Sequence, residues 1–189
     1  TDTDATNLEK LGVELMTATA ELITGVLDED LPIIRELLSY DALCPIACTF
    51  VRDQFGGVQR ALLPSPLHWS RQSEWPFALK HLNPQKDHVI LDIGGGWSVL
   101  KYALASRCNY LISLEVDWEF IQRTQKSIDL LGFKNIHQTQ GDARKIPFYD
   151  NKFDSVCCIS VLEHIDGEHL ACIREAIRVL KPGGTFVLT

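Results

Sequence analysis

The spacing of apolar residues predicts helices in the first part of the chain. In residues 5–29 the apolar positions recur three, four and seven apart, which is typical of an amphipathic helix: Leu8, Leu11, Leu15, Leu22 and Val26. A second helix is predicted over residues 28–43, where Asp30 can cap its first turn. A third is predicted over residues 44–55. Residues 62–82 contain three prolines and predict a loop that ends as a short helix.

From residue 88 onward, short apolar runs alternate with helical patterns. The apolar runs predict strands at 88–93, 110–116, 153–160 and 185–189, and NIHQTQGD predicts a further strand at 135–142 that ends in an acidic turn. The segments between them predict helices at 98–107, 117–132 and 168–180, the last followed by a Pro-Gly-Gly turn. Strands that alternate with helices form a parallel sheet covered on both faces. We therefore expect an α/β domain in this part of the chain.

A glycine-rich turn follows the first predicted strand, in the sequence LDIGGGWSVL. Such a turn between a strand and a helix brings the backbone close to an adenine cofactor, either a dinucleotide or S-adenosylmethionine. A dinucleotide site would require a small residue where Val99 stands. The carboxylate of Asp92 would also repel a diphosphate. Both residues favour a ligand with an ammonium group and no phosphate.

Four segments, in this order, resemble the class I S-adenosylmethionine-dependent methyltransferases, especially the small-molecule enzymes of the type 11 group. They read VILDIGGGWS, LISLEVD, QGDARKIPF and FDSVCCISVLEHI, the last continuing to REAIRVLKPGGTFVLT. The resemblance implies a Rossmann-like parallel sheet of about five strands, in the order 3-2-1-4-5, over residues 86–189. Residues 1–85 would then be a helical extension that acts as a lid. It also implies transfer of a methyl group to an O, N or C atom of a small acceptor by in-line displacement.

The resemblance assigns the nucleoside part of the cofactor to two acidic residues. Glu115 stands 23 residues after Asp92, at the end of the second strand, where it would accept the ribose hydroxyls. Asp117 is the alternative for this role, two residues later. Asp142 would accept the exocyclic N–H of adenine, and the backbone N–H of Ala143 would donate to the ring.

The methionine part is assigned to the glycine turn and the fourth strand. The carbonyls of Gly94 and Ser160 would accept from the ammonium group, and Asp92 would support that contact or hold the loop. Gly96 lets the backbone approach the ligand. Ser98 stands where many relatives have glycine, and we expect it to cap the following helix and to donate to the methionine carboxylate.

Three assignments have two alternatives each. His164 is a candidate general base, or a histidine that binds backbone or lines the pocket. Trp97 could pack on the N-terminal segment or border the substrate cavity. Near the end of the N-terminal extension, Arg71 or Glu74 could reach the methionine end of the cofactor and Trp75 could shield it. The alternative for these three residues is aromatic packing with a surface ion pair.

Composition narrows the classes of partner. The net charge is −7, and residues 1–43 account for −8 of it, so no basic stripe for nucleic acid is present. No apolar run of about 18 residues suggests a membrane span, and the first residues do not resemble a signal peptide. The six cysteines lack the spacing of a zinc site, and no acidic metal cluster is evident. We expect free thiols, no metal and a cytoplasmic protein.

The chain ends at Thr189, after the fifth predicted strand. The resemblance implies a further helix and a hairpin of strands 6 and 7, so we expect a truncated chain in which the hairpin is missing. An uncovered fifth strand could pair with a second copy, which makes a homodimer possible. A different class of function also stays open, namely an inactive module that binds S-adenosylmethionine as a regulatory or partner subunit.

Overall fold

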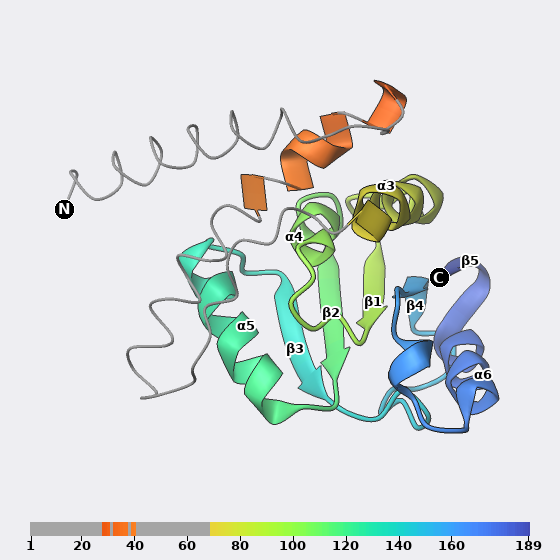
Figure 1. Cartoon of the computed structure of the whole chain (residues 1–189). Helices are drawn as coiled ribbons and strands as arrows, with labels where there is room; N and C mark the ends of the chain where they lie inside the picture. Colours follow the sequence, from red (N-terminus) through yellow and green to blue (C-terminus); the bar gives the residue numbers. More distant parts are fainter. Residues whose placement is uncertain (1–27, 31, 38, 41–68) are drawn as a thin grey trace. The chain divides into compact units, whose positions relative to one another are not determined.

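The computed structural model describes residues 28–30, 32–37, 39–40 and 69–189, and the chain divides into two compact units, Thr1–Pro76 and Phe77–Thr189 (Figure 1). In the first unit, a 3-10 turn at Asp28–Asp30 is followed by helical residues 32–37 and 39–40. These helical residues lie within the helix predicted over 28–43. The helix predicted over 44–55 and nearly all of that predicted over 5–29 lie outside the described residues. The role of residues 1–85 as a lid stays a prediction.

Helix α3 (Trp69–Leu82) is longer than the short helix that the prolines predicted. Pro76 lies inside it and removes one backbone donor, but burial of Trp75, Ala78 and Leu79 around the proline compensates. Arg71 and Glu74 therefore lie in the first part of this helix. Arg71 forms an ion pair with Glu74 one helical turn later, which agrees with the packing alternative for this segment.

The second unit contains a five-stranded parallel sheet. Its strands are β1 (Val89–Ile93), β2 (Tyr110–Glu115), β3 (Ile136–Gln140), β4 (Phe153–Cys158) and β5 (Leu180–Leu188). They lie in the order β3-β2-β1-β4-β5, from left to right in Figure 1, which confirms the predicted order. The connecting helices are α4 (Leu100–Ala105), α5 (Trp118–Leu130) and α6 (His169–Val179).

The two faces of the sheet bury different side chains because neighbouring residues of a strand point to opposite sides. On one face, Leu91 and Ile93 of β1 belong to an apolar cluster that includes Cys172, Ala176 and Val179 of α6. On the other face, Asp92 of β1 is buried near polar side chains of the next elements. Asp92 is 3% exposed, and Ser113 of β2 and Lys101 of α4 are fully buried. The first face is an ordinary hydrophobic core, whereas the second contains charge.

Strand β5 begins five residues before the strand predicted at 185–189. Its first pair joins Phe153 to Leu180 and the next joins Ser155 to Thr185, so the Pro-Gly-Gly segment lies in a bulge within the strand. Gly183 has a φ of +79°, which a bulge tolerates at glycine. Because bulges depend on strand pairing, the local sequence predicted only a turn here.

Within the described residues, no helix is long and apolar enough to cross a membrane. The cysteines that the structure describes are free and buried, at positions 108, 157, 158 and 172. The thiol of Cys157 faces Asp92 across the β1–β4 pair, with its Sγ atom 3.4 Å from Asp92 Oδ1.

Candidate functional site

The carboxyl ends of β1, β2, β3 and β4 bring the predicted site residues to one edge of the sheet. Parallel strands end on the same side, and ligands of open α/β sheets bind there, where the strand order reverses. β1 leads into Gly94, β2 ends at Glu115, β3 leads to Asp142 and β4 to Ser160. The arrows of β1, β2 and β3 point to this edge in Figure 1. Residues from four separate segments therefore share one edge.

Two positions in the glycine turn require glycine for different reasons. Gly94 has a φ of +65°, and a Cβ atom there would lie 2.7 Å from Val161, the residue after Ser160. Gly96 has a φ of +40°, although a Cβ atom would find room. The first position needs glycine for space and conformation, the second for conformation alone. The turn therefore runs close against the end of β4.

Glu115 contacts the glycine turn directly. Its Oε2 accepts from the N–H of Gly96 at 3.2 Å, and its Oε1 accepts from the N–H groups of Val116 and Asp117 at 2.8 and 3.2 Å. Asp117 is occupied differently, because its Oδ1 caps α5 by accepting from the N–H of Glu119 at 2.7 Å. A carboxylate accepts about four hydrogen bonds, so Glu115 keeps capacity for a ligand hydroxyl. This geometry favours Glu115 over Asp117 as the ligand-binding acid.

Asp92 lies beneath the turn and is 3% exposed. Its Oδ1 accepts from the thiol of Cys157, while Oδ2 has no hydrogen-bond partner among the described residues. Burial raises the pKa of Asp92, and the ammonium of Lys101 opposes that rise. A buried side chain in this place agrees with a role in holding the loop.

Ser98 and Trp97 connect the turn to the neighbouring helices. Ser98 Oγ accepts from the N–H of Leu100 at 3.2 Å, but the cap position of α4 is occupied by Val99, which makes no side-chain cap, so Ser98 lies one residue before the predicted position. Trp97 packs edge-on against Phe120 of α5, with ring centroids 5.5 Å apart, and Arg123 lies 5.9 Å from the same ring. This neighbour could not be predicted, because nothing in the sequence local to the turn indicates which helix lies beside Trp97.

Ser160 has a φ of +51° just after β4. The left-handed conformation costs a non-glycine residue about 1–2 kcal/mol. The N–H of Ser160 donates to the Oγ1 and carbonyl of Thr189, at 3.2 and 3.3 Å. Strain of this kind is concentrated at functional sites.

Asp142 is held by a neighbouring cation. Arg144 donates from Nε to both carboxylate oxygens at 3.0 Å and from an amino group to Oδ2 at 2.7 Å. The hydrogen bonds from Arg144 lower the pKa of Asp142. Ala143 packs against the core next to it. A ligand N–H would therefore share Asp142 with Arg144 or displace it.

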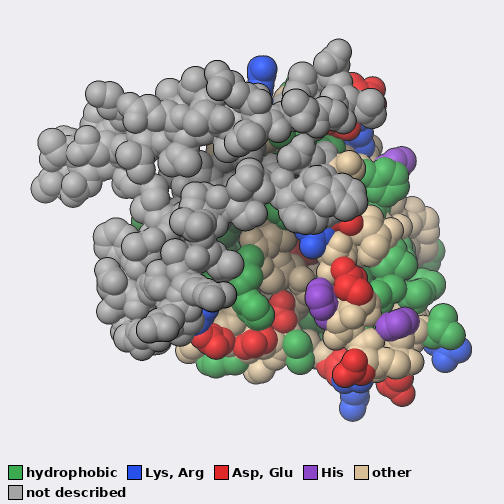
Figure 2. Space-filling view, in the orientation of Figure 1, with side chains coloured by type: hydrophobic (Ala, Val, Ile, Leu, Met, Phe, Trp, Pro, Cys, Tyr) green, Lys and Arg blue, Asp and Glu red, His purple; other side chains and the backbone are tan. Residues whose placement is uncertain are grey.

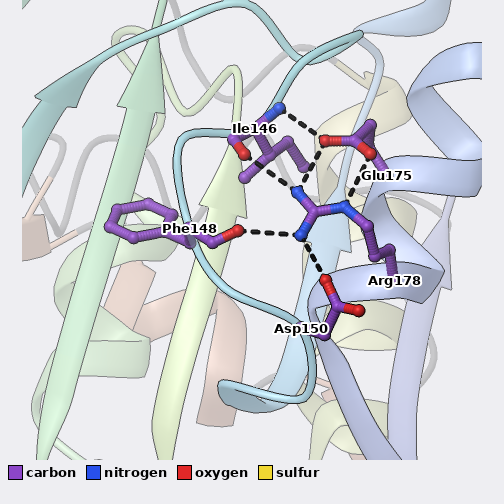
Figure 3. A network of polar contacts seen from close by, with 5 residues as sticks. All are labelled: Ile146, Phe148, Asp150, Glu175 and Arg178. Carbon is purple, nitrogen blue, oxygen red and sulfur yellow. Dashed lines mark hydrogen bonds and ion pairs between the residues drawn. The ribbon is translucent and has the colours of Figure 1, made fainter.

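An arginine on α6 fixes the loop that follows Asp142 (Figure 3). Arg178 donates to the carbonyls of Ile146 and Phe148 at 2.9 and 2.8 Å, and it pairs with Asp150 and Glu175 at 2.7 Å each. Glu175 in turn accepts from the N–H of Ile146 at 2.8 Å. The network joins residues 146–150 to α6. It therefore stabilises the loop that follows Asp142 and Ala143 in the chain.

His164 ends the short helix Leu162–His164 and is exposed. Its backbone N–H donates to the carbonyl of Val161 at 2.9 Å. The imidazole ring makes no hydrogen bond within the part of the chain that the structure describes. A role as general base therefore stays a prediction.

The loops at this edge carry an excess of negative charge. Segments 94–99, 115–119, 141–145 and 159–168 contain seven carboxylates and two Arg or Lys residues: Glu115, Asp117, Glu119, Asp142, Glu163, Asp166 and Glu168 against Arg144 and Lys145. Figure 2 shows acidic side chains along the lower part of this face. In the described residues, no group of three or more His, Cys, Asp or Glu side chains is arranged to hold a metal ion. Such an edge attracts cations and repels diphosphates.

The residues present fit S-adenosylmethionine better than a dinucleotide. The turn has no room for a side chain at Gly94, so only backbone faces Val161 there. Glu115 offers carboxylate oxygens beside that turn. The sulfonium and ammonium of S-adenosylmethionine are positive and suit an acidic edge, whereas a diphosphate does not.

Comparison with known proteins supports this fit. Residues 91–188 match a family model described as a methyltransferase domain. The uncharacterized methyltransferase YcgJ of Bacillus subtilis is 29% identical over 110 residues, which cover 58% of this chain and 43% of that protein. The ubiquinone/menaquinone biosynthesis C-methyltransferase UbiE of Rickettsia prowazekii is 31% identical over 133 residues, covering 67% of this chain and 52% of that protein.

Solved structures agree with the sequence comparison. The crystal structure of YcgJ superposes with a TM-score of 0.58 at 27% identity, covering 61% of this chain and 49% of that one. The PH0226 protein of Pyrococcus horikoshii superposes with a TM-score of 0.55 at 26% identity, covering 63% and 56%. The chain spans about half the length of the relatives that it matches. The matched family model covers half of the chain, and the chain belongs to the methyltransferase domain family, within the class I S-adenosylmethionine-dependent methyltransferases.

Proposed function

We propose that this chain is the cofactor-binding part of an enzyme that transfers a methyl group from S-adenosylmethionine to a small molecule. The observation that carries the proposal is the contact between Gly96 and Glu115, which joins the glycine turn of β1 to the acid at the end of β2. Family membership and the acidic edge support the same cofactor.

Six of the predicted residues receive a binding role in this proposal. Glu115 accepts a ribose hydroxyl through the carboxylate that also holds the turn. The carbonyls of Gly94 and Ser160 accept from the methionine ammonium, and Ser98 donates to its carboxylate. Asp142 and the N–H of Ala143 bind adenine, at the cost of loosening the Arg144 pair.

The chemistry of methyl transfer asks little of the protein beyond binding and orientation. When bound, S-adenosylmethionine supplies a methyl group on a positively charged sulfur. The chain's own task is to fix the sulfur end at the turn, so that an acceptor meets the methyl group in line and away from water. His164 is proposed to take the acceptor's proton on an imidazole nitrogen, if the acceptor has one to lose.

The acceptor is proposed to be a small molecule, as the names of relatives such as UbiE indicate for those proteins. Since the UbiE name specifies a C-methyltransferase, carbon acceptors are the first class to test. Specificity would come from residues 1–85 acting as a lid. Association of two copies of the chain is proposed as well.

The test is turnover with methyl-labelled S-adenosylmethionine and a panel of small aromatic, quinone and amine acceptors. Labelled product supports the proposed enzyme. Binding of S-adenosylmethionine without product from any acceptor, in the longest natural form of the protein, would favour the alternative of an inactive regulatory or partner subunit. A chain that binds NAD in place of S-adenosylmethionine would contradict both.

A further inference from the structure

A lysine is fully buried beneath the glycine turn. Lys101 lies on α4, and none of its surface is exposed. Its Nζ donates to the carbonyl of Gly96 at 2.8 Å and lies 3.4 Å from Ser113 Oγ on β2. Removing an ammonium group from water costs several kcal/mol, and an apolar side chain of similar length would avoid that cost. The position is therefore poorly explained by stability alone.

The lysine acts on the same residue that binds Glu115. The carbonyl of Gly96 accepts from Lys101 and also from Thr124 Oγ1 of α5, at 3.2 Å. The N–H of Gly96 donates to Glu115 Oε2. Both polar groups of Gly96 are thus fixed, one from below the turn by α4 and α5 and the other by the end of β2. This fixes a residue whose φ is +40°.

Charge explains why a lysine is suited to this place. Asp92 is buried on the same face of the sheet, and Glu115 lies at the end of the neighbouring strand. The ammonium of Lys101 opposes the rise that burial causes in the pKa of Asp92. A methionine at position 101 would fill the space, but it would neither donate to Gly96 nor offset the carboxylates.

We propose that Lys101 is a positioning residue for cofactor binding, which holds Gly96 in its left-handed conformation and thereby sets the carboxylate of Glu115 for the ribose. The inference rests on the proposed function. It adds a residue of α4 that does not itself touch the ligand but acts through Gly96 and Glu115.

The experiment measures binding of S-adenosylhomocysteine by calorimetry, together with thermal unfolding, for the full chain and two variants. Lys101→Met is expected to weaken binding at least tenfold and also to lower the melting temperature, because the buried carboxylate of Asp92 loses the cation that compensates it. Lys134→Met removes an exposed lysine between α5 and β3 and is expected to change neither value.

A double-mutant cycle distinguishes positioning from general damage. If Lys101 acts through Glu115, Lys101→Met weakens binding much less in a Glu115→Gln background than in the unaltered chain. Equal fold-losses in both backgrounds would overturn the inference. If Lys101→Met does not fold, Thr124→Val removes the second donor to the same carbonyl and is expected to weaken binding two- to fivefold. Unchanged affinity of that variant would also overturn the inference.

The two proposals fail in different ways. An unaltered chain that binds no S-adenosylhomocysteine overturns the proposed function and this inference with it. An unaltered chain that binds, with Lys101→Met binding within twofold of it, overturns the inference alone.

Discussion

Gly95 and Asp92 fit together so closely that a Cβ atom on Gly95 would lie 2.2 Å from Asp92 Oδ2. The carboxylate occupies the space that a side chain at position 95 would need, and Ser113 Oγ lies 2.7 Å from the same point. Because Asp92 is buried, its carboxylate has little room to move away. The glycine turn and the acid before it therefore form one packed unit.

This packing predicts that Gly95→Ala destabilises the chain by about 1–3 kcal/mol, the usual cost of overfilling a packed site. Gly132→Ala is the matched control, since Gly132 has a φ of +76° with nothing within 4 Å. It should lose only the cost of the left-handed conformation, about 1 kcal/mol. Urea unfolding measures both, and only Gly95→Ala should also weaken binding of S-adenosylhomocysteine. Normal binding by a folded Gly95→Ala variant would mean that Asp92 does not shape the turn.

Asp92 predicts a particular dependence of stability on pH. Burial raises its pKa above the usual value of 3.8, so the folded chain holds this proton more tightly than the unfolded chain does. The contribution of Asp92 to the free energy of unfolding is full below about pH 4 and falls as the pH rises through the raised pKa. Asp92→Asn removes that dependence. Urea unfolding gives the free energy of unfolding of the Asp92→Asn variant and of the unaltered chain. The value for the variant minus the value for the unaltered chain should increase between pH 4 and pH 7. A difference that stays constant would contradict a raised pKa for Asp92.

Glu115 and Asp117 stand two residues apart and predict opposite phenotypes. Glu115→Gln should weaken binding of S-adenosylhomocysteine by about 1–3 kcal/mol, the scale of a hydrogen bond to a charged group. Asp117→Ala should lose about 1 kcal/mol of stability, because it removes the cap of α5, and leave binding almost unchanged. Calorimetry and thermal unfolding of the two variants test this together. The reverse pattern would move the ribose contact to Asp117.

The Arg178 network predicts a stability contribution that acid removes. Hydrogen bonds from Arg178 lower the pKa of Glu175 below its usual value of 4.5. A carboxylate whose pKa is lowered by folding stabilises the folded chain at pH values above its pKa in the unfolded chain. That contribution is lost as the pH falls through its pKa in the folded chain. Glu175→Gln should therefore cost about 1–2 kcal/mol at pH 7 and progressively less below about pH 4.5. A loss that is the same at pH 3 and pH 7 would show that the charge of Glu175 is not what matters.

Much of the fold could be predicted because its signals are local. The strands β1, β2 and β4 are short runs rich in apolar residues, and the glycines after β1 mark the cofactor edge. The strand order and the family followed from four segments in sequence order. The predictions for the beginning of α3 and for the start of β5 were wrong, because prolines and glycines were taken to end a helix or a strand. In the structure, tertiary packing keeps Pro76 inside α3, and strand pairing keeps the Pro-Gly-Gly segment inside β5.

The neighbours of the turn could not be predicted in the same way. Trp97 packs on Phe120 of α5, and Lys101 is buried between Gly96 and Ser113 of β2, so both contacts depend on elements that come later in the chain. One signal was available for Lys101. It is the single charged residue in an otherwise apolar stretch, Val99–Ala105, and a helix that is apolar all round is buried together with any charge it carries.

The most direct test of the central claim is calorimetric titration of the 189-residue chain with S-adenosylhomocysteine, with NAD as the control ligand. The account predicts micromolar binding of S-adenosylhomocysteine and no binding of NAD. A folded chain that does not bind S-adenosylhomocysteine, or that binds NAD instead, would contradict it.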